Sequence, residues 1–174
     1  MIELTDEVNI ESLPELDLED ILKNRNYEKQ QIENILSNDA LILPEIARSD
    51  NTYEILKSEA LEIRKLLPKE IKAEIIKDQK KKHKYLDLLS ADIVLPIIVF
   101  LSWQAWDICK GFISAWLYAE YQSLKDRDKI PNAEVQVAII DRKKGISKRA
   151  KISGPANFVS QAIKELKHEE LFRK

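Results

Sequence analysis

Apolar residues recur at helical spacing along the first 90 residues of the chain. Residues 12–37 carry two such sets and predict one or two short helices that end at Ser37-Asn38-Asp39. Another helix is predicted after a cluster of cap-forming residues, and Pro68 interrupts it. The evidence is the helical spacing of Leu56, Ala60, Ile63 and Leu67. Residues 69–77 predict a further helix that runs into the lysines at 80–84. Residues 41–46 are apolar around a proline and fit no single element.

The most apolar stretch covers residues 93–119. It opens with Ile93-Val94-Leu95-Pro96 and carries three tryptophans, and it has no charged residue from Ile93 to Trp106. This uncharged run is shorter than the ~20 residues that a membrane-spanning helix needs. From the end of this run onward the apolar residues recur at helical spacing with polar residues opposite, which favours a pair of helices buried in a core or facing a second subunit. The stripe consists of Trp106, Cys109, Ile113, Leu117 and Leu124. Insertion into a membrane is the alternative.

The pattern changes to strand periodicity near residue 135. A strand is predicted by the alternation of Val135, Val137 and Ile139 with less apolar residues. Residues 142–145 are predicted to form a charged turn that ends in a glycine, and residues 146–152 to form the return strand of the hairpin. Ser153-Gly154-Pro155 then opens a last amphipathic helix. This part of the chain predicts a strand-turn-strand-helix (ββα) unit.

Together these elements predict an α+β protein. The N-terminal two-thirds is expected to be helical and to contain a long apolar helical segment, with the ββα unit at the C-terminus. We expect a helical region at 1–90, acidic and then basic, and a Trp-rich apolar region with the ββα unit at 91–174, forming one continuous structural unit.

Charge is unevenly distributed although the net charge is only −2. Residues 1–40 hold 11 acidic residues against three basic ones, whereas residues 63–84 hold nine basic residues against three acidic ones. Such blocks are usually solvated faces, and opposite blocks attract each other within or between chains. The acidic N-terminus does not have the pattern of a secretory signal, and the one cysteine favours a reducing cytosol, with membrane association as an alternative.

Few residues suit catalysis or cofactor binding. The chain has one cysteine, Cys109, inside an apolar stretch, and two histidines, His83 and His168, in charged segments predicted to be exposed helix ends. Three scattered glycines cannot form a phosphate-binding loop. The sequence therefore predicts a protein that is not an enzyme and that has no catalytic residue, no metal site and no cofactor.

The basic hairpin is the first candidate interaction site. Positive side chains can contact phosphates, but readers of single strands also present aromatic residues for base stacking, and this hairpin has none. A nucleic-acid partner is therefore not favoured, and protection of a strand edge is the better interpretation. The candidate residues in this hairpin are Arg142, Lys143, Lys144, Lys148 and Arg149.

Residues from about 111 to 166 resemble the effector-associated constant component family of bacterial conflict systems. The similarity lies in Ser114-Ala115-Trp116-Leu117, the strand Glu134–Ile139, the charged turn Arg142–Gly145, Gly154-Pro155 and the helix Phe158–Leu166. Members of that family are thought to be shared adaptors beside variable effectors and are not known as enzymes. The resemblance implies an adaptor role in antiviral defence.

The leading hypothesis is a cytosolic, non-catalytic interaction protein that oligomerises through Trp103, Trp106 and Trp116, because tryptophan is a frequent interface anchor. Its partner is a protein, a second copy of the chain, or both. Two alternatives stay open. One is an effector that inserts residues 93–119 into a membrane, and the other is an immunity or antitoxin protein whose acidic first 40 residues cover a basic toxin.

Overall fold

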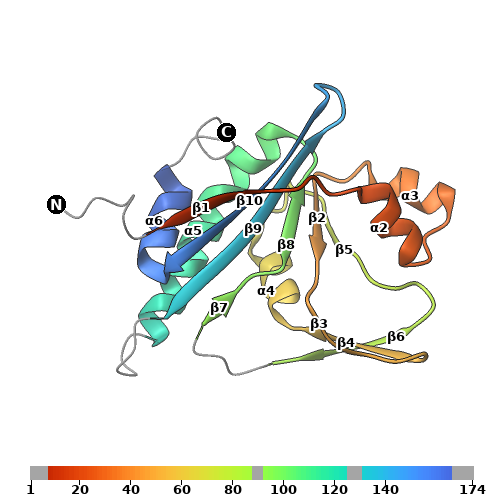
Figure 1. The fold of residues 1–174 in the computed structure, drawn as a ribbon, viewed down its shortest axis with the longest axis horizontal. Helices are drawn as coiled ribbons and strands as arrows, with labels where there is room; N and C mark the ends of the chain where they lie inside the picture. The colour runs from red at the N-terminus through yellow and green to blue at the C-terminus, as the bar shows by residue number, and fades with distance from the viewer. Residues whose placement is uncertain (1–7, 88–91, 125–130, 166–174) are drawn as a thin grey trace.

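A computed structural model describes residues 8–87, 92–124 and 131–165, and a mixed β-sheet runs through the centre of this part of the chain (Figure 1). Its strand order is β1-β10-β9-β8-β2-β5, and β7 also pairs with β9. The hairpin strands β9 and β10 are antiparallel, β8 runs parallel to β9, and β2 runs antiparallel to β8. The strands are β1 (Asn9–Leu13), β2 (Ala40–Leu43), β5 (Ala73–Ile75), β7 (Ile93–Val94), β8 (Ile97–Phe100), β9 (Asn132–Asp141) and β10 (Ile146–Pro155).

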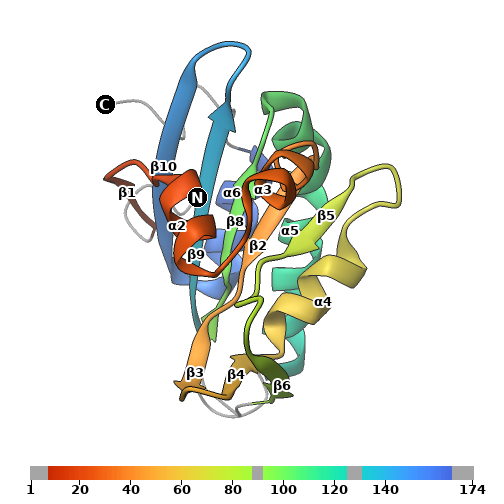
Figure 2. The same ribbon diagram turned by 90° about the vertical axis from the view of Figure 1, so that its right-hand side faces the viewer.

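Helices cover both faces of this sheet and bury a core on each side (Figure 2). One face carries α4 (Glu59–Leu66), α5 (Trp103–Leu124) and α6 (Ala156–Glu165). The other face carries α2 (Leu18–Asn24) and α3 (Lys29–Ile35). Successive residues of the central strands alternate between the two cores: Ile42 and Ile98 face α5, and Leu41 and Val99 face α2 and α3.

Local sequence signals explain the two short N-terminal helices. The Asp17 side chain accepts a hydrogen bond from the Asp20 backbone N–H at 3.1 Å and caps α2. Glu28 and Gln31 form a reciprocal capping box at the start of α3. Between the helices Asn26 has a φ of 65°, a left-handed conformation that asparagine tolerates better than most residues. The prediction of one or two helices within residues 12–37 is therefore confirmed.

A second, three-stranded sheet lies at the lower end of the molecule in Figure 1. Its strands are β3 (Ile46–Ser49), β4 (Tyr53–Lys57) and β6 (Lys82–Leu86), in the order β3-β4-β6. The β3–β4 pair is antiparallel, and β6 is parallel to β4. The chain passes from this sheet through α4 and β5 and returns to it, so residues 53–57 and 82–86 lie side by side.

The predicted arrangement of the α+β fold is wrong in its N-terminal two-thirds. Strands alternate with short helices there, and the described residues hold ten strands and five helices in total. Residues 69–77, expected to be helical, contain β5, and the lysine-rich residues that follow form β6. The first part of the predicted apolar helix pair is β7 and β8, whereas α5 begins only at Trp103.

The C-terminal prediction is confirmed in its elements. Strand β9 pairs with β10 over ten residue pairs from Asp141–Ile146 to Asn132–Pro155, and α6 follows directly. Gly145 in the turn has a φ of 64°, a left-handed conformation that glycine adopts without steric cost. The end of the predicted last helix, including Leu166 and His168, lies outside the described residues.

None of the helices in the described ranges has the length and apolar character required to cross a membrane.

Candidate functional site

Helix α5 presents an uncharged stripe to solvent along most of its length. The stripe is defined by residues at helical spacing on the side opposite the sheet, namely Gln104, Ile108, Gly111, Phe112, Ala115, Tyr118, Ala119 and Gln122. It extends for about 27 Å at 1.5 Å per residue. Three large side chains on it are exposed: Ile108 and Phe112 by 42% each, and Tyr118 by 51%. We call this surface the α5 stripe.

The opposite side of α5 is locked into the core. Trp106, Cys109, Ile113 and Leu117 are fully buried against the sheet, and the Trp106 ring meets Phe100 edge-on with 5.4 Å between ring centroids. A helix that is apolar on both sides is typical of one that packs against a second structure beyond its own core. The sheet accounts for one apolar side of α5, and no element among the described residues accounts for the α5 stripe.

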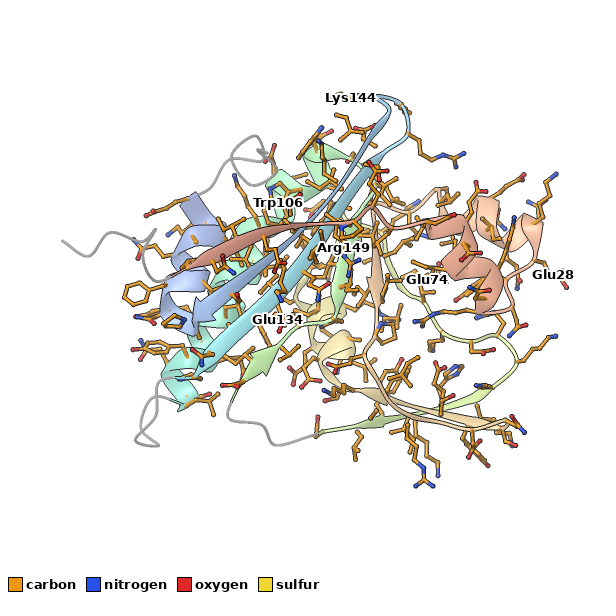
Figure 3. The ribbon with its side chains drawn as sticks, in the orientation of Figure 1. Glu28, Glu74, Trp106, Glu134, Lys144 and Arg149 are labelled. Carbon is orange, nitrogen blue, oxygen red and sulfur yellow. The ribbon has the colours of Figure 1, made fainter. Side chains whose placement is uncertain are left out.

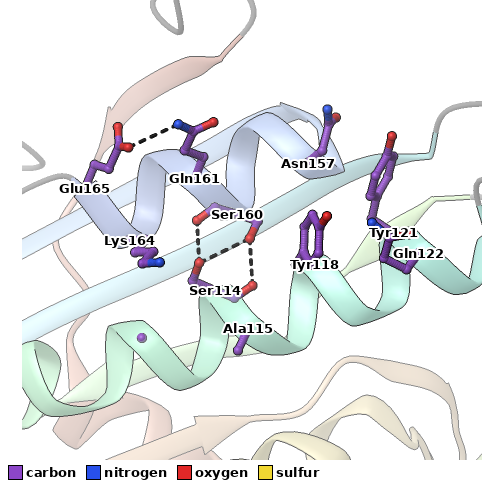
Figure 4. A pocket seen from close by; sticks show the side chains of 11 residues that line it. Ser114, Ala115, Tyr118, Tyr121, Gln122, Asn157, Ser160, Gln161, Lys164 and Glu165 are labelled. Atoms are coloured by element: carbon purple, nitrogen blue, oxygen red, sulfur yellow. Dashed lines mark hydrogen bonds between the residues drawn. The ribbon is translucent and has the colours of Figure 1, made fainter.

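A groove of about 710 Å³ lies beside the α5 stripe, between α5 and α6 (Figure 4). Its floor is a pair of reciprocal hydrogen bonds: the Ser114 hydroxyl donates to the Ser160 carbonyl at 2.6 Å, and the Ser160 hydroxyl donates to the Ser114 carbonyl at 2.7 Å. Tyr118 and Tyr121 of α5 and Asn157 of α6 line its walls. The buried Oδ1 atom of Asn157 accepts no hydrogen bond from the described residues.

A shallower depression of about 360 Å³ continues the groove toward the start of α5. It includes Ile108 and Phe112, and it shares Gly111, Ala115 and Lys164 with the groove. A side chain carbon at Gly111 would meet no atom within 4 Å, so the space above this glycine is open. The α5 stripe and the groove are therefore continuous: the stripe is uncharged, whereas the groove beside it is lined mainly by polar residues such as Ser114, Ser160 and Asn157.

The three tryptophans predicted as interface anchors occupy different environments. Trp106 is fully buried, so its ring cannot contact a partner in this conformation. Trp103 and Trp116 are half-buried and pack against the same core. An interface role for Trp103 and Trp116 remains a prediction, and one for Trp106 would require a change of conformation. The exposed apolar surface of the helix comes instead from Ile108, Phe112 and Tyr118, none of which was a predicted interface residue.

The five basic residues of the hairpin do not form one cluster: Lys144 lies at the turn, whereas Arg149 lies further along the hairpin (Figure 3). Arg142, Lys143 and Lys144 are exposed at the turn, where the Lys144 backbone N–H donates to the Asp141 side chain at 3.2 Å. Lys148 and Arg149 are successive residues of β10, so they point to opposite faces of the sheet. The Arg149 guanidinium donates to Gln136 Oε1 at 2.7 Å on the neighbouring strand β9.

The residues with reactive or titratable side chains are distributed as follows. Burial raises the pKa of the Cys109 thiol to about 12. His83 lies on β6, not at an exposed helix end, and its Nε2 atom is 4.0 Å from Oε1 of the buried Glu54. Among residues 8–87, 92–124 and 131–165, no group of three or more His, Cys, Asp or Glu side chains is placed to hold a metal ion.

No known protein family, curated protein or solved structure matches this chain.

Proposed function

We propose that this protein is a non-catalytic interaction protein that associates with a second copy of itself through the α5 stripe. The observation that carries the proposal is the absence of charge on this exposed stripe, in a chain of which 33% of the residues are charged. Depletion of charged residues and enrichment in aromatic ones distinguish the centre of a protein interface from the rest of a surface.

The α5 stripe is self-complementary, which favours a second copy as the partner. Small residues at 111, 115 and 119 lie beside the large residues Ile108, Phe112 and Tyr118. In an antiparallel pair with its two-fold axis at residue 115, Ala115 faces its own copy and Gly111 faces Ala119 of the other copy. These small residues and the open space above Gly111 let the two helices approach closely, and Phe112 of one copy lies beside Tyr118 of the other.

Charged residues at the border of the surface suit the rim of such an interface. Lys110 Nζ is 3.7 Å from Asp107 Oδ1 near the start of the helix, and Lys164 and Glu165 of α6 border the groove. Rim charges contribute less to affinity than to orientation and association rate.

An adaptor role in a bacterial conflict system is a further part of this proposal, and it rests on the resemblance of residues 111–166 alone.

The test is the mass of the protein in solution, measured by size-exclusion chromatography with light scattering. We expect the wild type at twice its chain mass of 20.2 kDa and the Ile108→Glu and Phe112→Glu variants at the mass of one chain. Ile46→Glu is the matched control, because Ile46 is an exposed isoleucine on β3 with the same exposed fraction of 42% as Ile108. A monomeric wild type, or the same mass for all four proteins, would contradict the proposal.

A further inference from the structure

The outer face of the small sheet β3-β4-β6 gathers positive charge around an exposed aromatic ring. In the register of β4 and β6, Tyr53 pairs with Lys82 and Ile55 pairs with Lys84, and Arg48 of β3 pairs with Ile55. Paired residues share a face of the sheet, so Arg48, Tyr53, Lys82 and Lys84 lie together. All four are exposed, with Tyr53 at 39%. We call this surface the β4 face.

The other side of the same sheet has a different composition. Glu54 and Leu56 alternate with the residues of the β4 face and are buried, and His83 and Tyr85 are half-buried. The one carboxylate within the three strands therefore points inward, toward His83. The cations of the β4 face are not neutralised by an acidic residue on the same strands.

The cations of the β4 face interact with the tyrosine ring. Lys84 Nζ lies 5.4 Å and Lys82 Nζ lies 6.0 Å from the centre of the Tyr53 ring. Arg48, Lys82 and Lys84 form no ion pair with a carboxylate among the described residues. The fourth basic residue of this face, Lys57, is engaged by Glu45 at 2.8 Å.

The nearby acidic groups are occupied in holding the loops around the β4 face. Asp50 accepts hydrogen bonds from the backbone N–H groups of Thr52 at 2.8 Å and Tyr53 at 2.7 Å, which fixes the turn that presents the tyrosine. Asp78 accepts from the Asn26 side chain at 2.9 Å and from the Lys80 backbone N–H at 3.0 Å. Asp50 keeps its negative charge and interacts with Arg48, so a ligand that approaches the strands meets Lys82 and Lys84 around Tyr53, with Arg48 beside Asp50.

We propose that the β4 face binds single-stranded nucleic acid, with a base stacked on Tyr53 and the neighbouring phosphates held by Arg48, Lys82 and Lys84. Proteins that bind single strands combine cations that follow the backbone with exposed aromatic side chains on which bases stack. The hairpin of β9 and β10 has the cations without the aromatic ring, whereas the β4 face has both. This site lies on other elements than the α5 stripe and does not depend on self-association.

The test is the fluorescence anisotropy of a labelled oligo(dT) titrated with the full-length protein at several salt concentrations. We expect Tyr53→Ala to weaken binding about tenfold and Tyr53→Phe to bind as the wild type does, because phenylalanine keeps the stacking surface. We expect Lys84→Gln to reduce the slope of log K against log salt by about 0.7, the value of one phosphate contact on a single strand. Ile10→Ala is the matched control, because Ile10 on β1 has the same exposed fraction of 39% as Tyr53 and lies in neither proposed surface.

Three results would overturn this proposal. They are the absence of oligo(dT) binding at low salt, equal binding by the wild type and Tyr53→Ala, and an effect of Ile10→Ala as large as that of Tyr53→Ala. Vesicles containing phosphatidylserine serve as a second probe, since a basic face also attracts anionic lipid. Binding to vesicles without binding to oligo(dT) would assign the β4 face to a membrane surface and reject the nucleic acid.

Loss of self-association in Phe112→Glu with unchanged oligo(dT) binding would show that the two proposed surfaces act independently.

Discussion

The serine pair between α5 and α6 offers a quantitative test of how these helices are joined. Ser114 and Ser160 are each 4% exposed, and each hydroxyl donates to the carbonyl of the other residue at 2.6–2.7 Å. The perturbation is the set Ser114→Ala, Ser160→Ala and the double variant. Each substitution removes one buried donor and leaves the carbonyl oxygen with its hydrogen bond inside the helix.

The expected magnitude follows from these contacts. A buried hydrogen bond contributes about 1 kcal/mol net, and alanine recovers up to about 0.5 kcal/mol through its higher helix propensity. Each single variant should therefore lower the free energy of unfolding by about 0.5–1 kcal/mol. Because the two serines are in contact, their losses should not add fully, and the double variant should lose about 0.5–1.5 kcal/mol, which corresponds to a decrease of roughly 1–6 °C in Tm for a chain of this size.

Urea denaturation followed by tryptophan fluorescence measures these changes, since α5 carries all three tryptophans. The two hydroxyl oxygens are 3.1 Å apart, so the two serines are also in direct contact. A double-mutant cycle should show a coupling energy of about 0.5 kcal/mol or more between them. A double variant as stable as the wild type would refute the assignment of this pair as the link between α5 and α6.

Two further predictions concern a buried tryptophan of the core and the dependence of the free energy of unfolding on acidic pH. Trp106→Ala should lower the free energy of unfolding, measured by urea denaturation, by about 3–5 kcal/mol, because the ring is fully buried. Trp106→Phe should lower it much less. Phenylalanine keeps an aromatic ring, and the change removes an Nε1–H group that has no partner among the described residues. Equal losses in the two variants would contradict this. Burial raises the pKa of Asp78, but hydrogen bonds from the Lys80 backbone and the Asn26 side chain outweigh it, and the pKa of Asp78 is lowered overall. This carboxylate therefore stabilises the fold above its unfolded pKa of about 3.9, and the contribution is lost as the pH falls through the lower folded value. In Asp78→Asn the free energy of unfolding should therefore decrease less steeply as the pH is lowered through the acidic range. The same pH dependence in the variant and the wild type would contradict the prediction.

The sequence predicted the elements whose periodicity is long and whose ends carry clear signals. Val135, Val137 and Ile139 all face the core between the sheet and α5, and the alternation in β9 is clear because Glu134 and Gln136 on the other face are polar and half-buried; Ala138, further along the strand, is buried in the second core. The spacing of Trp106, Cys109, Ile113 and Leu117 likewise identified the buried side of α5. In both elements one face is buried in the protein's own core, and periodicity is informative in that situation.

The central strands were not predictable from periodicity. Strand β8 packs against both helical layers, with Ile98 and Phe100 in one core and Val99 in the other. A strand buried on both faces appears as a continuous apolar run, which cannot be told from a buried helix by its pattern. Ile75 and Ile76 belong to the two cores for the same reason, and their spacing was interpreted as helical.

The candidate surfaces depend on tertiary contacts that the sequence does not contain. Phe112 and Tyr118 lie in the same apolar run as Trp106, and only the position of the sheet shows which of these rings is exposed. The only signal available was the lack of charged residues at helical spacing from Ile108 to Ala119. The β4 face joins residues 48–57 to residues 82–84 through a parallel strand pair, which no local pattern in either segment indicates.

The most direct test of self-association is the formation of an intermolecular disulfide by Ala115→Cys under mild oxidation. Residue 115 lies near the middle of the α5 stripe. In two helices packed with their axes about 8–10 Å apart, facing Cα atoms are about 3.5–5.5 Å apart, which overlaps the range of a disulfide. Cys109 does not interfere, because it is fully buried and its pKa is raised to about 12. We predict a covalent dimer for Ala115→Cys and none for the control Ala47→Cys on the exposed strand β3. A monomeric Ala115→Cys, or equal crosslinking of both variants, would contradict the proposal that the α5 stripe joins two copies of this chain.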